Sequence, residues 1–211
     1  GGNWDTLTSF GNSKKIISTI HVIEKITDDC KYQIDQHYVV RSRLFDILIK
    51  DWDRHEDQWR WASFDTKDGT LYRPIPRDRD QAFSKYDGFI NQVVHLVNPF
   101  MRQLTTYDDK IKNIKWVNWN AKYFDKSFTN EMTWADWEKE AQYIKENVTD
   151  EVIEQAFRDM PELSQDEEWE ELIKITKSRR DQIVEFAKLA YEYNNKKVDV
   201  IGTAGRDLFK V

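Results

Sequence analysis

Two short polar runs contain the residues of this chain that are best suited to chemistry. Residues 51–59 read Asp-Trp-Asp-Arg-His-Glu-Asp-Gln-Trp, and residues 76–83 read Pro-Arg-Asp-Arg-Asp-Gln-Ala-Phe. A buried core has no use for so many carboxylates, and a solvated face has no use for tryptophans beside them. Carboxylate and amide oxygens are the ligands that Mg²⁺ prefers in proteins. The two runs therefore predict a site for a cationic ligand.

The spacing of three of these residues is typical of phosphoryl transfer. Gln58 follows Asp53 by five positions, the separation between the catalytic Asp and the metal-binding Asn of a kinase catalytic loop. Asp80, in the second run, takes the place of the metal-binding Asp that follows that loop. Phosphoryl transfer needs mainly positioning and a divalent metal, so a metal–phosphate site is one hypothesis for the two runs.

At these residues the chain resembles known families. Residues 53–58 resemble the D-R-H-x-x-N loop of phosphatidylinositol kinases and atypical protein kinases, and residues 78–83 resemble the W-D-x-D-x-x-F segment of CotH-type kinases. From about Phe10 to Val211 the chain is similar to a region of Bacteroidetes envelope proteins. In those proteins the region often lies between a metallophosphoesterase domain and an outer-membrane β-barrel domain.

This resemblance implies a role for each candidate residue. Asp53 would be the catalytic base, Gln58 and Asp80 would be metal ligands, and Asp78 would be an additional ligand. The implied cofactors are Mg²⁺ or Mn²⁺ and ATP, and the implied partners are neighbouring domains of a longer polypeptide. The implied location is the bacterial cell envelope, on its periplasmic side or surface. No Gly-rich phosphate loop precedes Asp53, so the resemblance is to a kinase C-lobe without its N-lobe, either active or degenerate.

The alternative hypothesis is a non-catalytic structural or interaction module of a bacterial cell-envelope protein. In that case Arg54, Arg77 and Arg79 would pair with the carboxylates in a structural network. His55 is then expected to hold the loop backbone rather than to bind a metal. Convergence of Asp53, Gln58 and Asp80 around open solvent would favour the metal site, and arginines filling that space would favour the network.

Composition excludes several other classes of function. The net charge of −6 gives no general attraction for nucleic acid. Cys30 is the only cysteine, which excludes an intramolecular disulfide and a cysteine-based zinc site. No apolar run is long enough to span a membrane, and no signal peptide is recognised. A calcium loop counted from Asp51 fails, because Glu56 stands where Gly is needed and Ala62 where Glu is needed.

Two predicted elements position the polar runs. A helix over about 35–50, capped by Asp35, carries a buried stripe of apolar residues and leads into the first run. A β-hairpin follows, with strands over 58–64 and 70–75 and a turn at residues 67–69. Because antiparallel strands pair their ends, both runs should lie at the open end of the hairpin.

The remaining chain is predicted to be helical. The sequence predicts a single domain over 1–211 of the mainly α (α+β) class. This helical domain has a central β-hairpin and resembles a protein-kinase C-lobe. The further expected elements are an irregular entry over 1–12, helices over about 13–29, 89–98, 133–147 and 149–159, a surface connection over 106–130, a helix of about thirty residues from Ser164 to Asn194, and short strands within 196–211.

Overall fold

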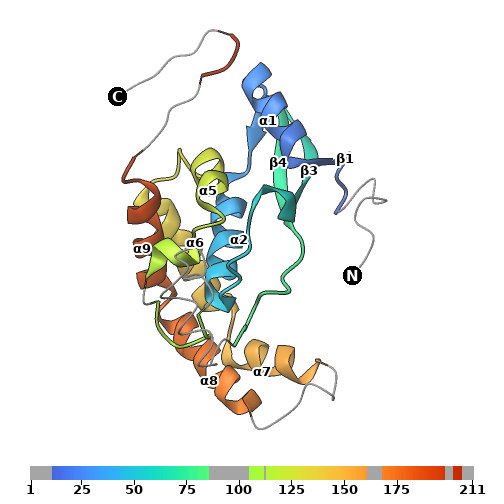
Figure 1. Ribbon diagram of the computed structural model, residues 1–211. Helices are drawn as coiled ribbons and strands as arrows, with labels where there is room; N and C mark the ends of the chain where they lie inside the picture. Colours follow the sequence, from blue (N-terminus) through green and yellow to red (C-terminus); the bar gives the residue numbers. More distant parts are fainter. Residues whose placement is uncertain (1–10, 86–104, 112, 161–167, 198–201, 206–211) are drawn as a thin grey trace.

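The computed structural model describes residues 11–85, 105–111, 113–160, 168–197 and 202–205. These residues form a mainly α structure with one small four-stranded mixed sheet, which confirms the mainly α (α+β) fold class (Figure 1). The elements are β1 Lys15–Ser18, α1 Thr19–Asp28, β2 Tyr32–Ile34, α2 Gln36–Ile49, a 3₁₀ turn at Glu56–Gln58, β3 Trp59–Thr66, β4 Gly69–Pro76, α4 Ile114–Val117, α5 Lys122–Phe128, α6 Trp134–Asn147, α7 Asp150–Arg158, α8 Glu168–Asp181 and α9 Ile183–Asn194.

Helix α2 is the central element of the fold and confirms the prediction over 35–50. The side chain of Asp35 accepts a hydrogen bond from the Tyr38 backbone N–H, as expected of an N-cap. The apolar stripe is fully buried, and the helix stops where Lys50 takes the left-handed conformation. In Figure 1, α2 runs between the sheet on one side and helices α6 and α9 on the other.

The hairpin is also confirmed, and its register decides where the polar runs lie. β3 and β4 pair antiparallel, with Trp59 opposite Pro76 at the open end. One step further out, the Arg77 backbone N–H donates to the Gln58 carbonyl oxygen at 2.9 Å. At the closed end Gly69 has φ +145° and lies against Lys31, where a Cβ would stand 2.0 Å from the Lys31 carbonyl oxygen. The two polar runs are therefore neighbours in space.

The sheet contains two edge strands that the sequence did not predict. Its order is β1-β3-β4-β2, with β1 antiparallel to β3 and β2 parallel to β4. The helix expected from Ser13 is wrong over its first turn, because residues 15–18 form strand β1 and the helix is capped by Ser18. The apolar residues of this segment fit either period, and pairing with β3 supplies the backbone hydrogen bonds that favour a strand.

The described residues form two apolar clusters, one on each side of α2. The first lies among α2, α6 and α9 and is largely aliphatic. The second lies under the sheet, where Trp59 stacks on Phe124 and Trp61 contacts Phe128. The surface connection expected over 106–130 is therefore wrong in part, because it contains α4 and α5, and α5 supplies two buried aromatic side chains to the core.

Helices α6 and α7 begin at the predicted capping residues, whereas the last predicted helix differs from the structure. Thr133 forms a capping box with Asp136 at the start of α6, and Thr149 caps α7. The long helix expected from Ser164 is divided, because α8 ends at Asp181 and α9 starts at Ile183. The predicted helix over 89–98, the entry over 1–10 and most of the predicted strands within 196–211 lie outside the described residues.

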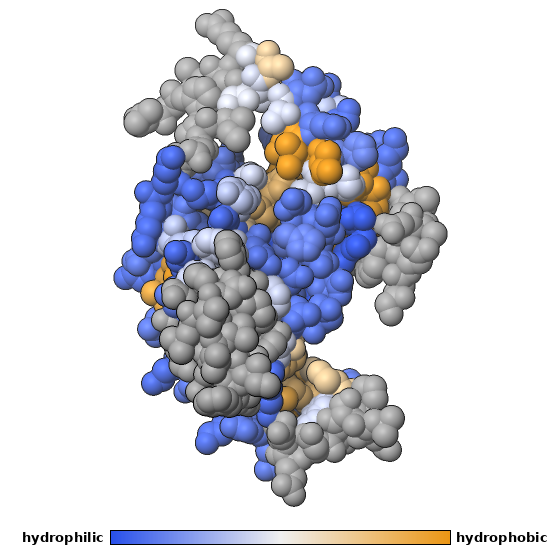
Figure 2. Space-filling model, viewed as in Figure 1, coloured by the Kyte–Doolittle hydropathy of each residue, from blue (hydrophilic) through white to orange (hydrophobic). Residues whose placement is uncertain are grey.

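The surface is mainly polar. Figure 2 shows a largely hydrophilic face with hydrophobic side chains gathered around α1 and the sheet. Helix α1 leaves Ile20 and Ile23 exposed. In the part of the chain that the structure describes, none of the helices combines the length and apolar character needed to cross a membrane.

Candidate functional site

Residues 51–58, the first acidic loop, and residues 77–80, the second acidic loop, are held together by one buried arginine. The Arg54 side chain has no exposed surface. Its Nη1 donates to the carbonyl oxygens of Arg77 at 2.5 Å and Asp78 at 2.9 Å, and its Nη2 donates to the Gln58 carbonyl oxygen at 3.4 Å. The guanidinium group also lies over the ring of Trp59, 4.7 Å from its centroid. Arg54 therefore fixes the backbone of both loops relative to one another.

The charge of Arg54 is balanced mainly from α2. Asp46 is fully buried and accepts hydrogen bonds from Arg54 Nε at 3.2 Å, Arg43 Nη1 at 3.0 Å and Arg79 Nε at 2.9 Å. Arg43 continues the network to Asp125 on α5 through a 2.6 Å hydrogen bond. Burial holds the pKa of Asp125 above its ordinary value, although Arg43 opposes this shift. These contacts tie α2, both acidic loops and α5 together.

Asp51 lies on the other side of Arg54. Its side chain is buried, and neither carboxylate oxygen accepts a hydrogen bond of normal geometry. The Arg54 Nη1 atom is 3.3 Å from Asp51 Oδ2, which makes an ion pair. Burial raises the pKa of Asp51 to about 7, the charge of Asp46 adds to this shift, and Arg54, Arg43 and the backbone N–H of Asp53 oppose it. Asp51 therefore titrates near neutral pH.

Asp53, the predicted base, is placed differently from these buried acids. Its side chain is 29% exposed, so one edge of the carboxylate remains accessible. Asn120, in the turn between α4 and α5, donates from Nδ2 to Asp53 Oδ1 at 2.8 Å. His55 Nε2 lies 4.0 Å from the other carboxylate oxygen. The structure thus holds the Asp53 carboxylate in one orientation while leaving it open to solvent, as a general base requires.

The predicted metal ligands lie at the same end of the hairpin but do not form a ready-made cluster. Gln58 is half-buried, whereas Asp78 and Asp80 are exposed. Within the described residues, no hydrogen bond or ion pair joins the side chains of Asp53, Gln58 and Asp80, and no group of three His, Cys, Asp or Glu side chains is placed to hold a metal ion. Carboxylate and amide oxygens are the donor types that Mg²⁺ and Mn²⁺ bind together with phosphate or water.

Two of the arginines assigned to the structural hypothesis share a partner outside the polar runs, and one of them also pairs within the first run. Arg54 and Arg79 pair with Asp46 of α2, and Arg54 also forms an ion pair with Asp51 of the first run. Over the described ranges, no arginine forms an ion pair with Asp53, Asp78 or Asp80. Arg54 therefore lies buried beneath the two loops, whereas Asp78 and Asp80 are exposed.

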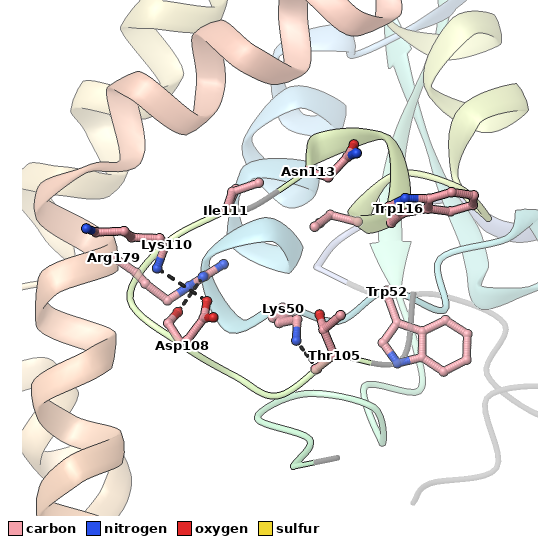
Figure 3. Close-up of a pocket in the computed structure, with 10 residues that line it drawn as sticks. Lys50, Trp52, Thr105, Asp108, Lys110, Ile111, Asn113, Trp116 and Arg179 are labelled. Atoms are coloured by element: carbon pink, nitrogen blue, oxygen red, sulfur yellow. Dashed lines mark hydrogen bonds between the residues drawn. The ribbon is translucent and has the colours of Figure 1, made fainter. Parts of the chain in front are cut away.

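A cavity of about 110 Å³ lies beside the first acidic loop, at the carboxyl end of α2 (Figure 3). Lys50 and Trp52 line it from one side and Arg179 of α8 from another. Arg179 is buried and donates to the carbonyl oxygens of Ile47 at 2.6 Å and Leu48 at 2.7 Å. These carbonyls lie at the end of α2, where the Lys50 backbone N–H also donates to Ile47 and the Tyr107 hydroxyl to Leu48, each at 3.2 Å. Arg179 thus adds donors at the end of α2 and supports the loop that follows.

Sequence reasoning missed three residues of this site. Asp46 and Arg43 lie inside an apolar helix, and Asn120 lies in a stretch without periodicity. The one available signal was the presence of charged residues in a helix whose other positions are apolar, since a buried charge is expected to be paired. No sequence signal connects Asn120 to Asp53.

Comparisons of the chain with family profiles, curated proteins and solved structures give no match.

Proposed function

We propose that the two acidic loops form a kinase-like site that binds a divalent metal and phosphate, with Asp53 as the base of a phosphotransferase. The observation that carries this proposal is the division of charge around Arg54. Arg54 and Arg79 both pair with Asp46, while neither of them forms an ion pair with Asp53, Asp78 or Asp80 among the described residues. Asp78 and Asp80 are exposed and Asp53 is partly exposed at the open end of the hairpin, where solvent gives a cation access to them.

The order of the elements supports the same proposal. A buried helix, an acidic loop, a β-hairpin and a second acidic loop follow one another, as the resemblance to a kinase C-lobe implies. In this scheme Asp53 accepts the proton of the attacking hydroxyl, and Asn120 keeps its carboxylate in position. Gln58 and Asp80 would hold the metal, with Asp78 as an additional ligand, and the metal would neutralise charge on the transferred phosphoryl group. Neighbouring domains of a longer polypeptide would supply the remaining contacts to ATP.

The test is a calorimetric titration of the chain with Mn²⁺, with and without ATP. We expect Mn²⁺–ATP to bind the wild-type chain and to bind Asp80→Asn at least about tenfold more weakly, which corresponds to about 1.4 kcal/mol. Asp68→Asn is the matched control, because Asp68 is an exposed acid in the turn at the opposite end of the same hairpin. Equal binding by all three proteins would place the metal elsewhere and contradict the assignment.

The second candidate is a non-catalytic structural or interaction module of a bacterial cell-envelope protein. The observation that favours it is the arginine network around Asp46, together with the lack of a three-ligand metal group in the described part of the chain. In that case neither Mn²⁺ nor Mn²⁺–ATP binds the wild-type chain. The same titration therefore separates the two proposals.

A further inference from the structure

More acceptors surround the Arg54 Nη1 atom than it has N–H groups to donate. This nitrogen carries two N–H groups, and it faces three acceptors: the carbonyl oxygens of Arg77 and Asp78, at 2.5 and 2.9 Å, and Asp51 Oδ2, at 3.3 Å. Both N–H groups go to the carbonyls of the second acidic loop, and the Asp51 carboxylate accepts neither. A buried anion next to donors that are used elsewhere is poorly solvated.

The groups that face Asp51 favour a change in its charge. Arg54, Arg43 and the backbone N–H of Asp53 attract the ionised carboxylate, and Asp46 repels it. Arg79 also pairs with Asp46 and adds positive charge beside Arg54. With Asp51 neutral, the Arg54 N–H groups remain on the two carbonyls. With Asp51 ionised, the carboxylate is a stronger acceptor than either carbonyl and attracts Nη1 away from the second acidic loop.

We propose that Asp51 is a positioning residue whose proton controls how Arg54 holds the second acidic loop, and hence where Asp80 lies relative to Asp53. The second loop is held tightly when Asp51 is protonated and loosened when it is ionised. Because burial raises the pKa of Asp51 to about 7, the change falls near neutral pH. Its consequence for metal and phosphate binding rests on the proposed function, whereas its effect on the loop does not.

The experiment is an NMR titration of the ¹⁵N-labelled full chain without ligand, from about pH 5.5 to about pH 8.5, the range in which only histidine is expected to titrate. We expect the backbone amides of Asp78, Arg79 and Asp80, and the Arg54 Nε–H group, to shift together with a midpoint at about pH 7. Asp51→Asn fixes the neutral state, so the shared transition should be lost. A second pair of proteins, with and without Asp51→Asn, carries His55→Gln, which removes the imidazole that lies 4.0 Å from Asp53.

Asp68→Asn is the control with the same change of charge, and it should keep the transition. A transition that persists in Asp51→Asn, or wild-type loop amides that do not shift, would overturn the proposal. If Asp51→Asn does not fold, the carboxyl ¹³C signal of Asp51 in the unsubstituted protein decides. A midpoint near that of free aspartate, about 4, contradicts the proposal, and one near 7 supports it.

The Mn²⁺–ATP titration, run on the same samples, keeps the two proposals separate. A loop transition without binding supports the role of Asp51 and refutes the metal–phosphate site. Binding without a loop transition refutes the role of Asp51 alone. If both proposals hold, the Kd of Mn²⁺–ATP changes with pH in the wild type and not in Asp51→Asn.

Discussion

The carboxylates beneath the two acidic loops differ sharply from those at their outer edge. Asp46 is fully buried and accepts hydrogen bonds from three arginines. Asp78 and Asp80 are exposed, and no arginine in the described residues pairs with them. Arg54 connects the two regions, because its side chain donates to Asp46 and to the backbone carbonyl oxygen of Asp78.

This comparison separates structural acids from acids that remain available for a ligand. A buried carboxylate must be paired, because an isolated charge in the interior is too costly. An exposed carboxylate is solvated and needs no partner, so it can exchange water for a metal or phosphate-bound metal. Asp51 belongs to neither group, since it is buried and only partly compensated.

The largest expected effect is at Asp46. Replacing it with Asn leaves Arg43, Arg54 and Arg79 without their shared negative partner, and breaking such a buried pair costs about 3–5 kcal/mol. The free energy of unfolding in urea measures this cost, with Asp68→Asn expected to change it by less than about 0.5 kcal/mol. A loss below about 1 kcal/mol for Asp46→Asn would mean that the network contributes little and that the comparison fails.

The next effect depends on pH. The pKa of Asp51 is about 7 in the folded protein, against about 3.9 for a free aspartate. A raised pKa means that the folded state binds the proton more tightly, so the stability of the wild type falls as the pH rises from about 4 to about 7. Asp51→Asn resembles the neutral acid, and we expect it to be more stable than the wild type at pH 8 by roughly 2–4 kcal/mol.

At pH 4 the advantage of Asp51→Asn should disappear, because Asp51 is then protonated in the wild type as well. Urea unfolding of both proteins at pH 4 and at pH 8 measures the difference in their free energies of unfolding. A constant difference between them at all pH values would show that Asp51 does not titrate in this range.

A smaller effect is expected at Asn120. Replacing it with Ala removes the 2.8 Å hydrogen bond to the half-buried Asp53, which should cost about 1 kcal/mol of stability. If Asp53 is a base, Asn120→Ala should also lower phosphotransfer more than it lowers Mn²⁺–ATP affinity. An equal loss of rate and affinity would indicate that Asn120 supports the loop as a whole.

The smallest effect is expected at the outer edge of the loops. Asp80→Asn should change the free energy of unfolding by less than about 0.5 kcal/mol, because Asp80 is exposed and lies outside the buried network around Asp46. Its effect should appear only when metal is present, as weaker binding and a smaller metal-induced rise in Tm. Destabilisation of more than about 1 kcal/mol without metal would place Asp80 among the structural acids.

Local signals in the sequence were reliable where they acted through neighbouring residues. The caps at Asp35, Thr133 and Thr149 and the hairpin turn before Gly69 were all predicted and confirmed. The strand at 15–18 and helix α5 were not, because their conformations depend on pairing with β3 and on packing against Trp59 and Trp61. Those partners are distant in the sequence, and periodicity carries no information about them.

For the candidate site, the sequence alone determined which residue types meet at the end of the hairpin, since a strand register fixes neighbours across a turn. Only the tertiary structure decided which acids are buried and which arginines pair with them. Arg54 takes its partners from α2, the first acidic loop and the second acidic loop at once. A guanidinium group has five donors with fixed directions, so its partners are chosen by where three separate segments lie in space, and that placement is set by the packing of the whole domain.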